Sequence, residues 1–205
     1  MSKQNQLLKL ILPIARVKTY RDCLVTHNIE ESGKVFFVVS GLALQNYANY
    51  PASDRGLSLA KIPGDFAGIR YLFPEYCQGS KIGLSVAGTA EVGSIKQIDL
   101  LRLLDYPTGG RTQLLFEEFI YEKQATERFY ERRAILSPQE LVFAHLQDHA
   151  TELGTAHPHG TKVPITVSTL ARLTGMSEEA IRRTTAILAE KGLLCKAGRH
   201  FLLFE

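Results

Sequence analysis

Hydrophobic residues near the C-terminal end recur at helical spacing in two short segments that a glycine separates. The first segment covers residues 167–174, and Thr166 before it is a typical N-cap residue. The second begins after Ser177, another N-cap residue, and ends before Gly192, where a glycine commonly terminates a helix. This pattern predicts a helix-turn-helix that turns at Gly175.

The second of these helices has two chemically different faces. Three residues that we expect to be buried share one side: Ile181, Thr184 and Leu188. The opposite side carries mainly polar residues: Glu179, Arg182, Arg183 and Ala186. A helix of this form, braced by a preceding helix, can enter the DNA major groove. An arginine pair also occurs on helices that only meet solvent, so the two helices alone leave both interpretations open.

A short hairpin is predicted directly after the second helix. Residues 193–195 and 200–204 are apolar except for His200, and the basic turn 196–199 lies between them. The hairpin favours a winged helix-turn-helix, with Lys196 and Arg199 placed to meet phosphates.

The first half of the chain has the pattern of short β-strands. The strongest candidates are 35–39, 42–44, 57–62, 82–86 and 90–95. Glycines and prolines punctuate these runs at regular intervals. Such spacing predicts a sandwich or roll.

Helices are predicted between the two regions. A short one covers 99–104, and a long one runs from Gly110 to Leu136 with an apolar stripe. The stripe can pack on the β domain, form a dimer seam, or do both, although Lys123 interrupts it. The expected seam residues are Leu115, Phe119, Lys123, Thr126 and Tyr130.

A new helix is predicted to start immediately after the long one. Ser137, Pro138 and Glu140 have the spacing of an N-cap, a first-turn proline and a capping-box glutamate. We therefore expect a helix from Pro138 to about Leu153, and a domain boundary with a hinge between Leu136 and Pro138.

Composition adds only mild constraints. The chain has 205 residues, 45% of them hydrophobic, and a net charge of +3. This length fits one large or two small domains. The region after Pro138 has as many acidic as basic residues, which counts mildly against non-specific nucleic-acid binding. The apolar run 7–14 is too short to span a bilayer and has no small-residue cleavage site, so we expect a cytoplasmic protein without a membrane partner.

Cys23, Cys77 and Cys195 are widely separated and form no CxxC motif. An odd, sparse set predicts reduced thiols instead of a disulfide framework. One redox-sensing thiol remains an alternative to three simple core residues.

The order of these parts resembles the Crp/Fnr family of bacterial transcription regulators. The similarity is most specific over 165–194, and the segments 38–41, 64–73 and 157–160 look like further family motifs. The resemblance implies an α+β fold with an N-terminal β-roll (1–108), a dimerisation helix (109–136) and a winged helix-turn-helix (137–205). It also implies a non-enzymatic homodimer that binds double-stranded DNA and RNA polymerase.

The effector pocket of this family departs from its cyclic-AMP pattern here. By resemblance, the pocket residues are Gly68, Ile69, Arg70, Ser80, Lys81, Thr126 and Glu127. Ile69 stands where cyclic-AMP-binding members carry a ribose-holding glutamate, and Ser80-Lys81 lacks the bidentate arginine that holds the phosphate. We therefore expect no cyclic AMP and no other cofactor, with a pocket that serves a different effector or is vestigial. A cysteine cluster for iron–sulfur is missing from the sequence, and His27 is the sole histidine before residue 145.

The expected DNA-binding residues combine the pattern and the resemblance. They are Thr166, Ser168, Ser177, Glu178, Glu179, Arg182, Arg183, Lys196 and Arg199. Glu178 stands where cyclic-AMP-type members carry an arginine, and a carboxylate cannot donate to guanine. The target sequence should therefore differ at that position.

Two other functions remain open from the sequence. A β-roll can hold a metal as in cupins, but the histidines other than His27 lie outside the roll. His145 and His149 are spaced i, i+4 and could bind a metal, without an HExxH motif. A small-molecule sensor that acts through protein partners, with no direct DNA contact, is the other alternative.

Overall fold

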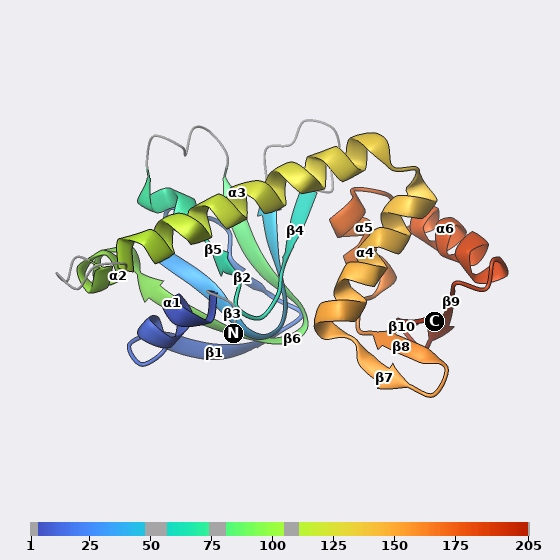
Figure 1. Cartoon of the computed structure of the whole chain (residues 1–205), viewed down its shortest axis with the longest axis horizontal. Coiled ribbons are helices and arrows are strands. Elements are labelled where there is room, and N and C mark those ends of the chain that lie inside the picture. The colour runs from blue at the N-terminus through green and yellow to red at the C-terminus, as the bar shows by residue number, and fades with distance from the viewer. Residues whose placement is uncertain (1–3, 48–56, 74–80, 105–110, 205) are drawn as a thin grey trace. The chain divides into compact units, whose positions relative to one another are not determined.

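The computed structural model describes residues 4–47, 57–73, 81–104 and 111–204 (Figure 1). The chain forms two compact units, and the boundary between them falls between Glu127 and Arg128, inside one long helix. The first unit is an antiparallel β-roll with helices, and the second combines helices with a small sheet. This is the expected α+β fold class.

An antiparallel six-stranded sheet forms the first unit. Its main path is β1-β6-β3-β4, while β2 pairs with β6 and β5 pairs with β3. The strands are β1 (Arg16–Arg21), β2 (Leu24–Thr26), β3 (Lys34–Tyr47), β4 (Leu57–Lys61), β5 (Phe66–Ala67) and β6 (Ile82–Lys96). The strands expected at 35–39 and 42–44 are one continuous strand, β3, and those expected at 82–86 and 90–95 are likewise joined in β6.

Gly41 explains why β3 continues through an apparent break. Its φ is +80°, and the pairing of β3 with β6 shifts register between Ser40 and Leu42. A Cβ at this position would lie 2.3 Å from the carbonyl oxygen of Thr89. The glycine therefore forms a bulge that bends the strand without ending it.

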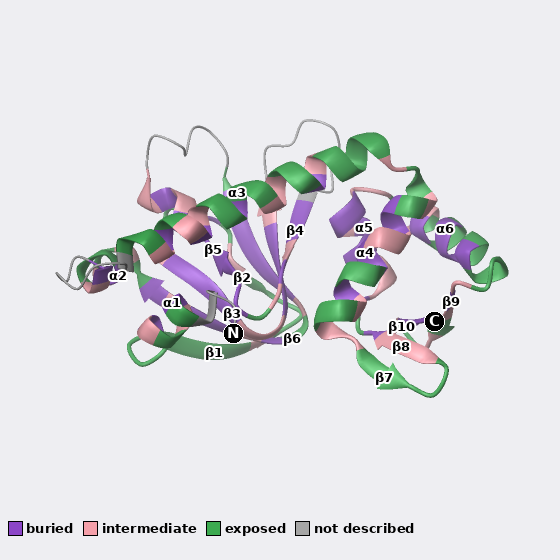
Figure 2. Ribbon diagram, in the orientation of Figure 1, coloured by how far each residue is buried: buried purple, intermediate pink, exposed green. Residues whose placement is uncertain are grey.

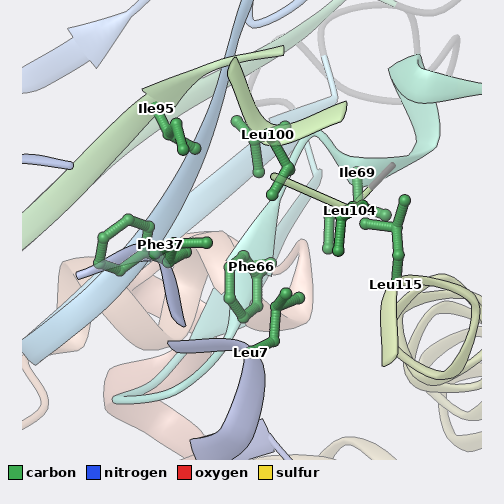
Figure 3. Close-up of a cluster of buried hydrophobic side chains, with 10 residues drawn as sticks. Leu7, Phe37, Phe66, Ile69, Ile95, Leu100, Leu104 and Leu115 are labelled. Atoms are coloured by element: carbon green, nitrogen blue, oxygen red, sulfur yellow. The ribbon is translucent and has the colours of Figure 1, made fainter. Parts of the chain in front are cut away.

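Helices close the core of the roll. They are α1 (Gln4–Ile11), the 3-10 turn η1 (Ile69–Leu72), α2 (Gln97–Leu104) and the first part of α3 (Arg111–Ile135). Figure 3 shows side chains from all four elements around Phe37 and Phe66 of the sheet. Helix α1 was not predicted, because the run 7–14 was considered only as a membrane segment. Leu7 and Ile11, spaced i, i+4, are both completely buried.

The second unit contains α4 (Pro138–Leu153), β7 (Thr155–His157), β8 (Gly160–Val163), α5 (Val167–Thr174), α6 (Glu178–Glu190), β9 (Leu194–Ala197) and β10 (His200–Leu203). The capping box before α4 is confirmed, because Ser137 accepts from Glu140 N and the Glu140 carboxylate accepts from Ser137 N. The sheet has the order β7-β8-β10-β9. Its β7–β8 hairpin was not predicted beyond the turn at 157–160. No helix of the described residues is long and apolar enough to cross a membrane.

Candidate nucleic-acid interface

Side-chain caps and one glycine define the helix-turn-helix. Thr166 Oγ1 accepts from Thr169 N at 3.2 Å at the start of α5, and Ser177 Oγ accepts from Ala180 N at 3.1 Å at the start of α6. Gly175 ends α5 in the left-handed conformation, with a φ of +70°. The predicted start and turn of both helices are thus confirmed, and local chemistry accounts for them.

Helix α6 buries one face and exposes the other (Figure 2). Ile181, Thr184 and Leu188 are buried, as their spacing indicates. The exposed residues of the opposite face include Glu179, Arg182, Arg183 and Ala186. Both arginines are therefore accessible to a partner, and α6 is held in place by its apolar side.

Each arginine of α6 pairs with a glutamate one turn earlier. Arg182 Nη2 donates to Glu178 Oε2 at 2.9 Å, and Arg183 Nη1 lies 3.9 Å from Glu179 Oε1. Exposed i, i+4 pairs of this kind stabilise a helix only by about 0.3–0.5 kcal/mol. Phosphates or base edges can therefore displace the carboxylates at little cost, and the arginines remain available as donors.

The wing consists of β9 and β10 joined by a turn at Gly198, which has a φ of +67°. Leu194 and Phe201 anchor the hairpin in the core of the unit. Lys196 and Arg199 are exposed. Lys196 lies in strand β9, not in the turn as predicted, because the hairpin pairs Lys196 with Phe201 and leaves only two residues unpaired.

The remaining candidate DNA contacts differ in environment. Ser168 is exposed, whereas Thr166 is half-buried and its hydroxyl also lies 3.0 Å from Thr169 Oγ1. The side chains of Thr166 and Ser177 are occupied as helix caps. Any contact from these two residues to a phosphate therefore falls to the backbone or to an already bonded hydroxyl.

Arg133 lies beside the turn of the helix-turn-helix and was not predicted. A Cβ built on Gly175 would come within 2.9 Å of Arg133 Nη1. The guanidinium therefore covers the glycine that ends α5. The two residues are far apart in the sequence, and no local pattern signals their contact.

Part of the apolar stripe of α3 packs on the roll, and other apolar side chains of the helix remain exposed. Leu115 is 4% exposed and belongs to the core of the roll, and the half-buried Phe119 packs on Phe73 with ring centroids 5.0 Å apart. Leu115 is therefore a core residue and not the seam residue that was expected. Larger apolar side chains that remain exposed on α3 are Phe116, Ile120 and Tyr121.

The other expected seam residues have partners within the chain. Lys123 is exposed and pairs with Glu127 at 3.8 Å, and the half-buried Thr126 donates to the carbonyl of Glu122 at 2.8 Å. Tyr130, also half-buried, meets the ring of Phe129 edge-on at 5.6 Å.

The expected effector-pocket residues lie in different surroundings. Ile69 is completely buried in the core of the roll (Figure 3), and Gly68 beside it has a φ of +93°. Arg70 is half-buried, whereas Lys81 and Glu127 are exposed. Ser80 lies outside the described residues.

A buried polar cluster in the roll was missed by the sequence analysis. Its members are Gln45 and Tyr47 of β3, Lys61 of β4, Asp65, and Glu118 and Glu122 of α3. One feature of the sequence could have indicated this cluster, because Lys61 lies two residues after Leu59 and therefore on the same face of its strand. Glu118 and Glu122 also lie on the same side of α3 as Leu115.

The cysteines and histidines of the described residues do not come together in a metal or disulfide site. Cys195 is half-buried and free, Cys23 of the roll is exposed and free, and Cys77 lies outside the described residues. His145 and His149 are buried with ring centroids 6.3 Å apart. Among the described residues, no group of three or more His, Cys, Asp or Glu side chains could hold a metal ion.

The chain matches no known family profile and no curated protein sequence. Its structure is similar over nearly the whole length to solved transcription regulators. The c-di-GMP-responsive global regulator CLP of Xanthomonas campestris has 23% identity and a TM-score of 0.74, and the match covers 98% of this chain and 99% of that one. FixK2 from Bradyrhizobium japonicum has 19% identity and a TM-score of 0.73, with 93% and 92% covered.

A Crp-family transcriptional regulator from Thermus thermophilus is similar to the same extent. It has 18% identity and a TM-score of 0.74, with 92% of each chain covered. The roll, the long helix and the helix-turn-helix all fall within these matches. The chain therefore has the fold of the Crp/Fnr transcription regulators.

Proposed function

We propose that the protein is a transcription regulator that binds a specific DNA sequence as a homodimer. The observation that carries the proposal is the arginine-bearing face of α6, which is exposed while the opposite face is buried. A recognition helix needs this arrangement, because its outer face must reach base edges while its inner face fixes its position. The fold shared with solved regulators supports the same function.

Individual roles follow from the chemistry of each side chain. Arg183 can donate two hydrogen bonds to a guanine edge, and Glu179 can accept from a cytosine amine. Arg182, Lys196 and Arg199 supply positive charge for phosphates. Ser168, and the backbone at the α5 and α6 N-termini near Thr166 and Ser177, add further phosphate donors. Glu178 holds Arg182 in the free protein.

The homodimer is proposed to form through the exposed side of α3. Phe116 and Ile120 supply apolar area, and Lys123, Thr126 and Tyr130 follow along the helix. Two recognition helices in such a dimer lie about 34 Å apart, so the operator should be an inverted repeat. The family likeness extends the proposal to RNA polymerase as a partner, and a regulator of this kind acts in the cytoplasm.

Cyclic AMP is not proposed as the effector. Ile69 is completely buried and has no hydrogen-bond acceptor on its side chain, so it cannot hold a ribose hydroxyl. The exposed Lys81 lacks the planar two-donor geometry with which arginine binds phosphate. The roll is proposed to serve a different effector or none.

Fluorescence anisotropy with labelled duplex DNA, repeated over a range of salt concentrations, tests the proposal. We expect binding that weakens steeply with salt, because each neutralised phosphate releases counterions. Retention of the full affinity in high salt would contradict the proposed phosphate contacts. No binding to a pool of random duplexes at low salt would refute direct DNA binding.

A further inference from the structure

The polar cluster inside the roll is closed off from solvent. Gln45 is completely buried, and Lys61, Glu118 and Glu122 are 4%, 6% and 7% exposed. Such groups are buried in proteins only when they are paired, because charge is costly to remove from water. Their arrangement therefore needs a physical explanation.

Donors in the cluster converge on one oxygen of Glu122. Gln45 Nε2 donates to Glu122 Oε1 at 3.1 Å, and Lys61 Nζ lies 3.9 Å from the same atom. Glu122 Oε2 and Gln45 Oε1 are buried and have no hydrogen-bond partner among the described residues. Buried acceptors without a hydrogen are unfavourable. The cluster therefore has fewer hydrogen-bond donors than these buried acceptors require.

The cluster also has an excess of negative charge. Lys61 faces three carboxylates, those of Asp65, Glu118 and Glu122. Arg70 also acts on Tyr47 of the cluster, so the three carboxylates still outnumber the two cations. Asp65 accepts from Ile62 N at 3.0 Å, which favours its ionised form. A proton on one of the other two carboxylates would reduce the excess of negative charge.

We assign that proton to Glu118, because it is 6% exposed, whereas Glu122 accepts from Gln45 and faces Lys61. Burial raises the pKa of Glu118 to about 7, with further increases from Asp65, Glu122 and Glu117, while Lys61 lowers it. Burial alone would lower the pKa of Lys61, but Glu122, Asp65, Tyr47 and Tyr121 raise it overall, so the lysine keeps its own proton.

The position of Glu118 connects the cluster to the proposed dimer face. Glu118 and Glu122 occupy the roll-facing side of α3, one turn apart, while Phe116 and Ile120 are exposed on the same stretch of helix. Repulsion among the buried carboxylates would push α3 away from the roll. A change in that packing moves the residues through which the dimer is proposed to form.

We propose that one proton in this cluster controls how α3 packs against the roll. Uptake of the proton by Glu118 allows the helix to pack closely and favours the DNA-binding dimer. Loss of the proton leaves uncompensated negative charge in the core and loosens the helix. The DNA-binding part of this inference rests on the proposed function. The assignment of the proton to Glu118 does not depend on the proposed function.

Carboxyl 13C NMR of the full chain tests the proton site. We expect one glutamate carboxyl to titrate near neutral pH in the unmodified protein and to be missing from the spectrum of Glu118→Gln. The proposal is overturned if every glutamate carboxyl titrates below about pH 5.5. This measurement requires no DNA, and its decisive arm uses the unmodified protein.

DNA affinity measured from pH 6 to 8.5 tests the control. We expect the Kd of the unmodified protein to rise with pH, by at most about tenfold per pH unit for each proton coupled to binding. Glu118→Gln should bind at all pH values like the protonated protein. Glu131→Gln, which changes an exposed carboxyl on the same helix, should keep the original profile.

The outcomes separate the two proposals. An equal pH dependence in the unmodified protein and Glu118→Gln would overturn the control while leaving DNA binding intact. A failure to bind DNA at every pH would overturn the proposed function, and with it the control of DNA binding, while the NMR titration would still decide the proton site.

Discussion

In helix α6 the guanidinium of Arg182 donates to the carboxylate of Glu178 one turn earlier, at 2.9 Å. The pair lies at the N-terminal end of the helix that is proposed to face DNA. Glu178 therefore both neutralises a donor for phosphate and brings negative charge to the interface. In the proposed complex the Glu178 carboxylate would compete with phosphate for the guanidinium of Arg182.

Replacing Glu178 should strengthen DNA binding. In Glu178→Gln, Arg182 no longer has a charged partner, and a repulsion from the phosphates is removed. We expect about three- to tenfold tighter binding to non-specific duplexes at low salt. Anisotropy titrations would measure this, with Glu190→Gln at the far end of α6 as the control. Weaker binding by Glu178→Gln would show that the glutamate contacts DNA favourably.

Removal of the wing arginine should weaken binding to all sequences alike. Arg199 is exposed at the hairpin turn and is proposed to bind phosphate. In Arg199→Ala, the slope of log K against log salt should become shallower by about one unit. A loss confined to one DNA sequence would instead assign base reading to Arg199.

Substitution of Phe116 should separate the dimer without unfolding the protomer. Phe116 is 54% exposed in the single chain, so a charge there would be buried only in the dimer. We expect Phe116→Glu to sediment as a folded monomer at micromolar concentration. Phe119→Glu is the comparison, because it should also lower the unfolding free energy by disturbing the packing on Phe73. A dimeric Phe116→Glu would contradict the proposed interface.

One buried histidine should contribute a loss of stability in mild acid. Burial, with smaller effects of His149 and Arg132, lowers the pKa of His145 to about 4, while Asp148 raises it slightly. Below pH 6.5 the unfolded chain binds a proton that the folded protein refuses, so stability is lost as pH falls and levels off near 4. The contribution of His145 to the slope should be about 1.4 kcal/mol per pH unit. The raised pKa of Glu118 contributes in the opposite direction, because the folded protein then takes up a proton as pH falls from 7.

Denaturant unfolding between pH 7 and 4.5 would measure this loss. In His145→Leu the titrating group is removed, so on lowering the pH this variant should lose less stability than the unmodified protein, and the difference between the two measures the contribution of His145. The exposed His159→Ala serves as the control. An unchanged decline in His145→Leu would assign the acid sensitivity to other groups.

Local chemistry explains which elements could be predicted. Ser137 and Glu140 cap α4 through atoms three residues apart, and Gly192, with a φ of +71°, follows α6 as expected. The faces of α6 followed from spacing alone. At Gly41 the same reasoning failed, because a glycine that usually separates strands here provides a bulge within one strand.

Long-range contacts explain what could not be predicted. Lys61 and Glu122 are 61 positions apart along the chain, and the sequence does not indicate that their charges meet inside the roll. Leu115 could serve the core or a dimer from its position on the stripe alone. Only the packing of α1, α2 and η1 around it decides for the core.

Selection of binding sites from random duplex DNA tests the central claim most directly. The experiment uses the unmodified protein and Arg183→Ala, whose guanidinium is exposed one turn beyond Glu179. We predict that the unmodified protein enriches an inverted repeat with half-sites about one helical turn apart, and that Arg183→Ala loses stringency at one position in each half-site, worth roughly 1–3 kcal/mol. Enrichment of the same motif with equal stringency by both proteins, or of no motif by the unmodified protein, would contradict base reading by α6.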